Sequence, residues 1–307
     1  MRNILVTGGT VFVSKYVAEY YAKKGDKVYV LNRNTRPQPE NTILIEGDRK
    51  KPGDKLKAYR FDVVIDVTAY NGQDIIALCE SLGEFGEYIM ISSSAVYPEN
   101  NAQPFTEEQP TGANIFWGKY GTDKIEAEAE LRRRVPDAYI LRPPYLYGPG
   151  NNVYRESFVF DCARAGRKFY LPRDGEMKLQ FFHVEDLCRF MDVLLTQKPK
   201  ERIFNVGNPE SITVKEWVQM CYEVVGSECT MIPVHEELNQ RDYFCFYDYE
   251  YALDVTGQRR WLPKTKDLKA GLTESYDWYR ENEGEVRKKD FINFLIGYPF
   301  GTLYRRR

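Results

Sequence analysis

The sequence predicts an α/β fold with a doubly wound parallel sheet and a smaller mixed α/β lobe in its C-terminal half. Three observations predict it. Short apolar segments, which suit strands buried on both faces, alternate with amphipathic helical segments over the first 150 residues. A Thr-Gly-Gly-Thr turn joins the first apolar segment to the first helical one. After about residue 150, loops rich in Gly, Pro and Asn and many aromatic residues replace the alternation.

Each expected element follows from a local pattern. The helix at 14–24 carries an apolar stripe and is ended by Gly25, the helix at 73–82 is capped by Asn71, and Thr213 with Glu216 forms a capping box that opens a late helix. Further helices are expected at 119–134 and 184–196. The expected strands are 3–7, 27–31, 43–46, 63–67, 88–91 and 203–206.

The composition is that of an ordinary globular protein. Of the 307 residues, 43% are hydrophobic and 29% are charged, and the net charge is −2, so no polybasic field recommends nucleic acid as a partner. Neither a signal peptide nor a membrane span is expected, because no segment has the required apolar run. The six cysteines form no CxxC pair and no metal-ligand spacing, which predicts reduced thiols in the cytoplasm and no metal.

The first turn has the order of strand, glycine turn and helix that is typical of a dinucleotide site. Gly8 permits a sharp turn, and Gly9 lets backbone N–H groups approach a pyrophosphate. The fuller fingerprint has two more glycines, where this chain has Val11 and Ser14. Alone, the turn fits either a cofactor loop or a plain strand–helix connection. In a Rossmann-type fold, its cofactor contacts would be Thr7, Gly8, Gly9, Thr10, Phe12 and Val13.

Other strand ends supply the remaining candidate cofactor contacts, because ligands of parallel sheets bind beyond the carboxyl ends of the strands. Thr68 and Ala69 follow one strand. Asn32 stands where an acidic residue would accept the ribose hydroxyls of NAD, and the next residue, Arg33, suits a 2′-phosphate, which favours NADP over NAD. The alternative for Arg33 is a solvated loop arginine. Asp48 could bind the adenine amino group or simply stabilise a turn.

Tyr120 and Lys124 lie four residues apart at the start of an expected helix and so share one face. A nearby ammonium favours the phenolate and can bring a phenol pKa of about 10 into a useful range. Such pairs also arise by chance: Tyr20 and Lys24 form one, which we interpret as a surface pair. Tyr120 differs because Ser93, at the end of a buried strand, could place its hydroxyl beside the phenol and polarise the same substrate oxygen.

These motifs together resemble the extended short-chain dehydrogenase/reductases, the superfamily of nucleotide-sugar epimerases and dehydratases to which the NAD-dependent epimerase/dehydratase family belongs. The resemblance implies that Tyr120 is the acid/base, that Lys124 holds the nicotinamide ribose and lowers the phenol pKa, and that Ser93 binds the reacting oxygen. Ser94 and Ala95 replace the acidic pair of sugar 4,6-dehydratases, which argues against dehydration. The motifs are TGGT (7–10), ISSSAVY (91–97), YGTDK (120–124), LRPPYLYGPG (141–150), FFHVEDL (181–187) and FNVGN (204–208).

The resemblance also implies a division of the chain and an atypical substrate site. Residues 1–165, with a later contribution from about 181–207, would form the NAD(P)-binding Rossmann domain, and 166–307 would mainly form the substrate lobe. Tyr145 replaces an asparagine that contacts substrate phosphates in nucleotide-sugar enzymes, and Leu179 replaces an arginine. Arg155 also fits a solvated loop, and His183 a structural histidine. The candidate substrate contacts are Ser94, Tyr145, Arg155, Lys178 and His183.

The resulting prediction is an NAD(P)-dependent epimerase or oxidoreductase that transfers a hydride at a hydroxyl or carbonyl carbon of a small molecule, with a nucleotide sugar favoured. One alternative is a non-catalytic NAD(P)-binding scaffold or an RNA-binding protein, as in a divergent branch that includes chloroplast stem-loop RNA-binding proteins. The acidic balance argues against RNA. The other alternative is a small-carbonyl reductase. Related proteins form dimers through the helices expected at 73–82 and 119–134, so the resemblance implies a homodimer.

Overall fold

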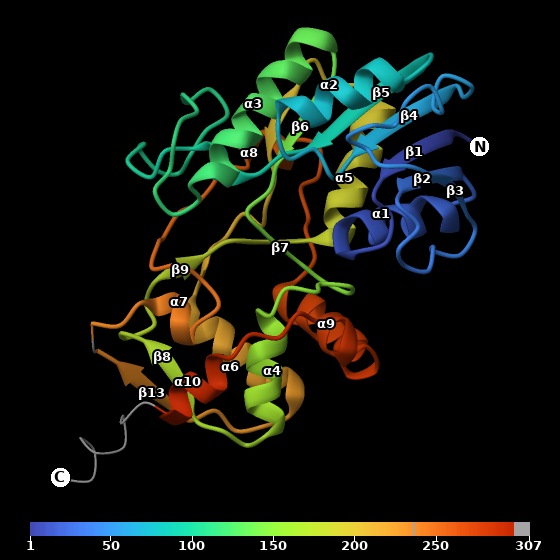
Figure 1. The fold of residues 1–307 in the computed structure, drawn as a ribbon. Coiled ribbons are helices and arrows are strands. Elements are labelled where there is room, and N and C mark those ends of the chain that lie inside the picture. Colours follow the sequence, from blue (N-terminus) through green and yellow to red (C-terminus); the bar gives the residue numbers. More distant parts are fainter. Residues whose placement is uncertain (236, 298–307) are drawn as a thin grey trace, which may run out of the picture. The chain divides into compact units, whose positions relative to one another are not determined.

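The computed structural model describes residues 1–235 and 237–297. The chain divides into two compact units, each described here by itself (Figure 1). The first unit comprises Met1–Gly150, Gln180–Glu210 and Tyr251–Lys266, and the described part of the second comprises Asn151–Leu179, Ser211–Glu250 and 267–297. Positions 236 and 298–307, which belong to the predicted substrate lobe, lie outside the described residues.

The first unit is built on a seven-stranded sheet in the order β11-β6-β5-β4-β1-β2-β3. Every neighbouring pair in this sheet is parallel, as the apolar strand segments predicted. Its strands are β1 (Asn3–Thr7), β2 (Lys27–Asn32), β3 (Thr42–Glu46), β4 (Phe61–Asp66), β5 (Phe85–Ile91), β6 (Tyr139–Arg142) and β11 (Ile203–Asn205).

Helices cover both faces of this sheet, which confirms the doubly wound α/β class. One core packs α1 (Phe12–Lys23) and α5 (Val184–Gln197) on one face. The other core packs α2 (Gly72–Ser81) and α3 (Lys119–Arg134) on the opposite face. The unit also contains a 3₁₀ turn η1 (Ser94–Val96), α8 (Thr256–Arg259) and a two-stranded parallel sheet of β7 (Tyr145–Tyr147) and β10 (Phe181–His183).

Local sequence signals predicted the ends of α1, α2, α3 and α5 to within two residues of the observed ends. Asn71 caps α2 by accepting a hydrogen bond from the Asp74 amide, as predicted. Helix α1 begins at Phe12, two residues before the expected start, with Val11 as its N-cap. The interpretation of Tyr20 and Lys24 as a mere surface pair was wrong. The Tyr20 hydroxyl donates to Asp192 Oδ2 at 2.8 Å and Lys24 forms an ion pair with the same carboxylate, so both side chains fasten α1 to α5.

The second unit mixes helices with short strands, as the fold-class prediction required. The predicted capping box is present, because Thr213 and Glu216 bond reciprocally at the start of α6. Strand β8 pairs with β13 in parallel, and β9 pairs with β12 in antiparallel fashion. The elements are α4 (Glu156–Arg164), β8 (Phe169–Pro172), β9 (Lys178–Leu179), β12 (Ile212–Thr213), α6 (Val214–Val225), β13 (Met231–Val234), α7 (Gln240–Tyr243), α9 (Leu268–Glu281), η2 (Glu283–Glu285) and α10 (Phe291–Gly297).

Two global expectations concern cysteines and membranes. All six cysteines are free thiols. Among the helices of the described residues, none combines the length and the apolar character that crossing a bilayer requires.

Candidate functional site

The strand order of the sheet locates a candidate ligand site. Strand β1 has β2 on one side and β4 on the other, so the direction of winding reverses between β1 and β4. In open parallel sheets, ligands bind outside the carboxyl ends of the strands at such a switch point. The glycine turn follows β1, and the loop with Thr68 and Ala69 follows β4. The predicted cofactor loops therefore start at the switch point.

The glycine turn has a backbone that needs both of its glycines. Gly8 and Gly9 have φ angles of +91° and +89°, in the left-handed region that side chains disfavour. A Cβ atom on Gly9 would lie 2.5 Å from a methyl carbon of Val30, and one on Gly8 would lie 2.9 Å from Ser14 Oγ. Ser14 is buried and donates to the Val11 carbonyl at 2.9 Å. The serine thus fits at the packing position because Gly8 leaves room for it.

The N-terminus of α1 fits a phosphate group. Its N-cap, Val11, makes no side-chain capping bond, whereas Asn71, Thr213 and Asp267 cap their helices with a side-chain oxygen. First-turn N–H groups have no partner within a helix, and an anion at the positive end of the helix can accept their hydrogen bonds. Positive-φ glycines followed by a helix without a side-chain cap therefore fit the diphosphate of a dinucleotide, with Thr10, Phe12 and Val13 beside it.

The predicted contacts after β2 and β3 have different roles. Asn32 Nδ2 donates to the Gly8 carbonyl at 2.7 Å and to Gln38 Oε1 at 2.8 Å, so this side chain holds the glycine turn. Arg33 is exposed at the end of β2, where a 2′-phosphate would be accessible to it. Asp48 is also exposed, and its carboxylate accepts the Lys50 amide at 2.9 Å, as in a simple turn.

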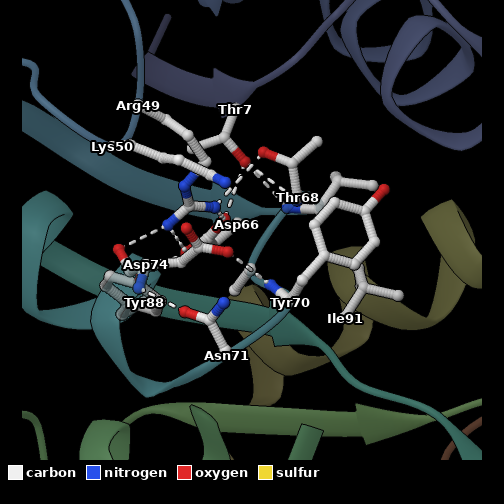
Figure 2. Close-up of polar contacts among 12 residues, drawn as sticks. Thr7, Arg49, Lys50, Asp66, Thr68, Tyr70, Asn71, Asp74, Tyr88 and Ile91 are labelled. Atoms are coloured by element: carbon white, nitrogen blue, oxygen red, sulfur yellow. Dashed lines mark hydrogen bonds and ion pairs between the residues drawn. The ribbon is translucent and has the colours of Figure 1, made fainter. Parts of the chain in front are cut away.

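The sequence analysis missed a buried ion pair at the switch point. Asp66, the last residue of β4, is fully buried and accepts hydrogen bonds from Thr7, Tyr88 and Arg49 (Figure 2). Thr7, predicted as a cofactor contact, is itself buried, and its oxygen also accepts the amides of residues 67 and 68. Burial alone would raise the pKa of Asp66, but Arg49 and the two hydroxyls hold it below its usual value. Arg49 stands in the charged loop sequence "DRKK", and no local signal identifies it as a buried partner.

Lys124 meets the loop after β4. Its ammonium, on a side chain only 2% exposed, donates to the carbonyls of Ala69 at 2.6 Å and Ile91 at 2.9 Å. The ring of Tyr70 lies 5.3 Å away. Burial lowers the pKa of Lys124 to about 8. An ammonium has three N–H donors, and these carbonyls account for two of them. The predicted residues Ala69 and Lys124 are thus in direct contact.

A close backbone approach brings the segment with Tyr120 to the turn with Ser93. A Cβ atom on Gly121 would lie only 2.4 Å from the Ala95 carbonyl oxygen, so the first turn of α3 packs directly against η1. The hydroxyl of Ser93, the N-cap of η1, accepts the Ala95 amide at 3.2 Å. Tyr120 is 42% exposed, so a substrate can reach its ring. The serine and the tyrosine therefore lie on two adjoining segments at one edge of the sheet.

A second buried network, also missed, supports this turn from within. Arg142 forms a bidentate ion pair with Glu128 at 2.6 and 3.0 Å, and Ser92 donates to the same carboxylate. Arg142 also donates to the Tyr97 hydroxyl at 2.8 Å, which in turn donates to Asn205. Three quoted motifs and helix α3 meet here, because these residues belong to "ISSSAVY", "LRPPYLYGPG", "FNVGN" and α3.

Three of the candidate substrate contacts belong to the first unit and are buried. Ser94 donates to the Tyr251 hydroxyl at 3.1 Å, and the Tyr145 ring lies 5.7 Å from the Tyr251 ring. His183 accepts the Glu185 amide through Nδ1 at 3.2 Å. Burial, helped by Lys266, lowers the pKa of His183 to about 3, so its imidazole is neutral near pH 7.

The other two candidates belong to the second unit. Arg155 is the N-cap residue of α4, and its guanidinium lies 5.9 Å from the centre of the Phe246 ring. Lys178 is exposed on β9, and its backbone amide donates to Glu250 at 2.7 Å. Leu179, beside it, is buried. Within this unit, Arg155 and Lys178 are the predicted cations.

A doubly wound parallel sheet with a glycine turn at its switch point defines the class of dinucleotide-binding α/β proteins. Within that class, residues 4–207 match the model of the NAD dependent epimerase/dehydratase family. This match covers more than half of the chain, and the protein belongs to that family. It is thus an NAD(P)-dependent enzyme of the extended short-chain dehydrogenase/reductase type, as the motifs predicted.

Curated relatives include proteins of different activities. The chloroplast stem-loop binding protein of 41 kDa b from Arabidopsis thaliana is 27% identical over an alignment of 302 positions, which covers 90% of this chain and 79% of that protein. GDP-L-fucose synthase 1 from the same plant is also 27% identical, over an alignment of 220 positions that covers 63% of each chain.

Solved structures share the fold. The UDP-glucose 4-epimerase of Thermotoga maritima, determined with UDP-glucose, has a TM-score of 0.73 at 21% identity and covers 92% of this chain and 99% of its own. The dTDP-glucose 4,6-dehydratase of Bacillus anthracis, in complex with NAD, has a TM-score of 0.72 at 20% identity and covers 93% and 99%. At these identities the likeness concerns the fold alone.

Proposed function

We propose that this protein is an epimerase or reductase that transfers a hydride at a hydroxyl or carbonyl carbon of a nucleotide sugar. The observation that carries the proposal is the packing of α3 on η1 through Gly121, which places Tyr120 on a segment adjoining that of Ser93. Lys124, on the same helix, is held by the carbonyl at the end of β5 and by Ala69. A phenol, a hydroxyl and an ammonium at one sheet edge suit proton transfer beside a bound dinucleotide.

The roles follow from the chemistry of each side chain. NAD(P), when bound, supplies the hydride acceptor and donor. The Tyr120 phenol moves the proton to or from the reacting oxygen, and the Ser93 hydroxyl donates a hydrogen bond to that oxygen. The remaining N–H of Lys124 is available to a ribose hydroxyl, and its positive charge favours the phenolate form of Tyr120.

The substrate class rests on the relatives. GDP-L-fucose synthases, dTDP-glucose dehydratases and an epimerase solved with UDP-glucose carry nucleotide sugars in their names. The exchange of the dehydratase acidic pair for Ser94 and Ala95 favours epimerisation or reduction over dehydration. For the cofactor, NADP is favoured over NAD because Arg33 is exposed and because position 32 is an asparagine where an acidic residue would bind the ribose hydroxyls of NAD.

A second candidate function is RNA binding without turnover. It is favoured by the 27% identity, over 90% of this chain, to a chloroplast stem-loop binding protein. The net charge of −2 opposes it, because RNA affinity relies on basic surfaces. Reduction of a small carbonyl compound is a third possibility, suggested by Tyr145 and Leu179.

Assembly and location complete the proposal. We infer a homodimer through α2 and α3, which light scattering would test, and a monomer at micromolar concentration would contradict it. The free thiols suit the reducing conditions of the cytoplasm.

The experiment that tests the function combines a nucleotide-sugar panel with matched variants. Wild-type protein is incubated with NAD or NADPH and each sugar nucleotide, and products are identified by NMR. Tyr120→Phe should lower kcat by on the order of 10²–10⁴, and Ser93→Ala by on the order of 10²–10³. Tyr20→Phe is the control, because Tyr20 belongs to the other Tyr-x₃-Lys pair and should leave kcat within about two-fold.

The outcomes separate the candidates. Turnover of a sugar nucleotide that depends on Tyr120 would support the proposal. Turnover of small aldehydes or ketones alone would replace the substrate class. If the wild type turned over neither and bound a labelled stem-loop RNA at physiological salt, the RNA-binding function would take its place.

A further inference from the structure

Arg49 links two loops and the first turn of α2 near the switch point, although it belongs to none of the motifs quoted above. It lies on the connection that follows β3. One guanidinium nitrogen donates to Asp66 Oδ1 at 2.6 Å and to Thr68 Oγ1 at 3.2 Å. The other donates to Asp66 Oδ2 at 3.1 Å and to the Asp74 carbonyl, in the first turn of α2, at 2.7 Å (Figure 2). One side chain thereby joins the loops after β3 and β4 and the start of α2.

Asp66 extends this connection to the glycine turn. Its Oδ1 accepts the Thr7 hydroxyl at 2.7 Å, and Thr7 is the last residue of β1, directly before Gly8. The Thr7 oxygen accepts the backbone amides of Val67 and Thr68 at 3.0 and 3.1 Å. The glycine turn and the loop after β4 are therefore held at a fixed separation by a chain of bonds that ends at Arg49.

The pair also balances a buried charge. Asp66 is fully buried, and the side chain of Arg49 is 11% exposed. Both remain ionised: the attraction of Asp66 outweighs burial and raises the pKa of Arg49, while that of Asp66 stays below its usual value. Without Arg49, a negative charge would remain at the sheet edge where the diphosphate of a dinucleotide, itself an anion, is expected. In a poorly solvated site, such repulsion is strong.

We propose that Arg49 is a positioning residue of the cofactor site, which acts by holding Asp66 in an ion pair. The ion pair fixes the glycine turn against the loop after β4. It also cancels the negative charge of Asp66, which would otherwise repel the cofactor diphosphate. This inference rests on the proposed function, since it assumes that a dinucleotide binds at this edge. Arg49 acts through Asp66 and Thr7 and is assigned no contact with the cofactor.

The test measures dissociation constants for NAD and NADPH by fluorescence, at low and high ionic strength, together with the Tm of each variant. Arg49→Met should weaken binding by about ten-fold or more. The double variant Arg49→Met/Asp66→Asn removes both charges and should recover part of that loss, because it leaves no uncompensated carboxylate. High salt should reduce the difference in dissociation constant between Arg49→Met and wild type, since it screens the repulsion between Asp66 and the diphosphate. Arg49→Lys, which keeps the charge, should bind more tightly than Arg49→Met.

The control uses an ion pair at the opposite end of the same strands. Arg2, directly before β1, forms a bidentate pair with Asp26, directly before β2. Arg2→Met should lower the Tm and leave both dissociation constants within about two-fold, because the amino ends of the strands face away from the switch point.

Four results would overturn or redirect the inference. Unchanged binding by Arg49→Met would contradict it. A double variant no better than the single one, with no effect of salt, would reduce Arg49 to a structural residue. If Arg49→Met does not fold, the affinities of Arg49→Lys and of the double variant test the inference instead. Equal losses of nucleotide affinity of more than ten-fold in both variants would contradict the charge argument. Failure of wild-type protein to bind either nucleotide would instead overturn the cofactor assignment itself, and this role with it.

Discussion

At the scale of single residues, burial decides what a side chain can do. Lys124 and His183 are both buried bases, and burial lowers the pKa of each, to about 8 and about 3. The consequence differs. Lys124 keeps its charge near pH 7, held by two carbonyls, while His183 is neutral and bonds a backbone amide. Lys124 therefore remains a candidate for the cofactor ribose, and His183 acts as the N-cap of α5.

The lowered pKa of Lys124 makes stability depend on pH. In the unfolded chain the pKa returns to 10.5, so between about pH 8 and 10.5 the unfolded state binds more protons and stability rises with pH. From about pH 7 to about pH 9.5, the unfolding free energy of wild type should gain roughly 2 kcal/mol relative to Lys124→Met. Denaturant titrations at several pH values measure this difference.

An exposed lysine on the same helix provides the control. Lys119 has its pKa raised by a hydrogen bond to Asp123, so its titration lies above this range. Lys119→Met should follow the pH dependence of wild type. If the difference in unfolding free energy between wild type and Lys124→Met did not change with pH, Lys124 would not be buried as a charged group.

The second glycine of the turn is limited by both backbone and space. In Gly9→Ala, the new Cβ would overlap Val30 in addition to straining a positive φ. We expect a loss of about 1–3 kcal/mol in stability and more than ten-fold weaker nucleotide binding. Gly25→Ala separates the two causes, because Gly25 has a similar φ of +86° and open space around its Cβ position. It should lose about 1–2 kcal/mol of stability and keep its affinity, and equal affinities in both variants would contradict this account.

At the scale of elements, the approach of α3 to η1 positions the candidate catalytic groups. Only glycine permits it at position 121, because the Ala95 carbonyl fills the place of a side chain. The buried ion pair of Arg142 with Glu128 fastens α3 to β6 and, through Ser92, to the end of β5. The two segments that carry Ser93 and Tyr120 are thus each anchored by backbone contact and by a buried charge pair.

Gly121→Ala should push α3 away from η1 by a few tenths of an ångström or more. A catalytic hydrogen bond is sensitive to such shifts, so kcat should fall by about ten-fold or more, with a smaller change in cofactor affinity. Steady-state kinetics and nucleotide titration measure the two effects. Gly284→Ala, where a Cβ meets no atom within 4 Å, should change neither. Wild-type kcat in Gly121→Ala would contradict the positioning role of this contact.

At the scale of the whole molecule, cofactor binding should stabilise the fold, because a ligand that binds only the folded state raises the unfolding free energy. With saturating NADPH at about 100 times the dissociation constant, the gain is about 2.7 kcal/mol. Arg33→Ala should abolish the excess stabilisation by NADPH over NADH and leave that by NADH unchanged. Thermal unfolding with each nucleotide measures this.

A charge-matched control keeps the interpretation specific. Arg60→Ala removes the same charge from an exposed position at the amino ends of the strands, where Arg60 lies 3.8 Å from Glu84. It should not alter the difference between the nucleotides. Equal effects of Arg33→Ala and Arg60→Ala would mean that only net charge matters, and the 2′-phosphate assignment would fail.

Much of the fold could be read from local patterns. The strand segments, the Asn71 cap and the capping box of Thr213 depend on near neighbours in the chain, and the structure contains each of them. The same holds for the carboxyl-edge loops, because parallel strands must end at one edge. Tyr20 and Lys24 show the limit of such reading, because their partner Asp192 lies 172 and 168 residues away.

The sequence by itself determined the α/β class and the glycine turn, since periodicity and local motifs carry that information. Through the resemblance of its motifs to a known family, it also predicts Ser93, Tyr120 and Lys124 as the catalytic residues. Only the tertiary structure decided that Arg49 neutralises Asp66, that Asn32 holds the glycine turn, and that His183 is neutral and capped to its helix. These properties depend on which distant segments meet and how far water is excluded from them. A charged residue in an ordinary loop sequence therefore reveals its role only when the fold buries it beside its counter-ion.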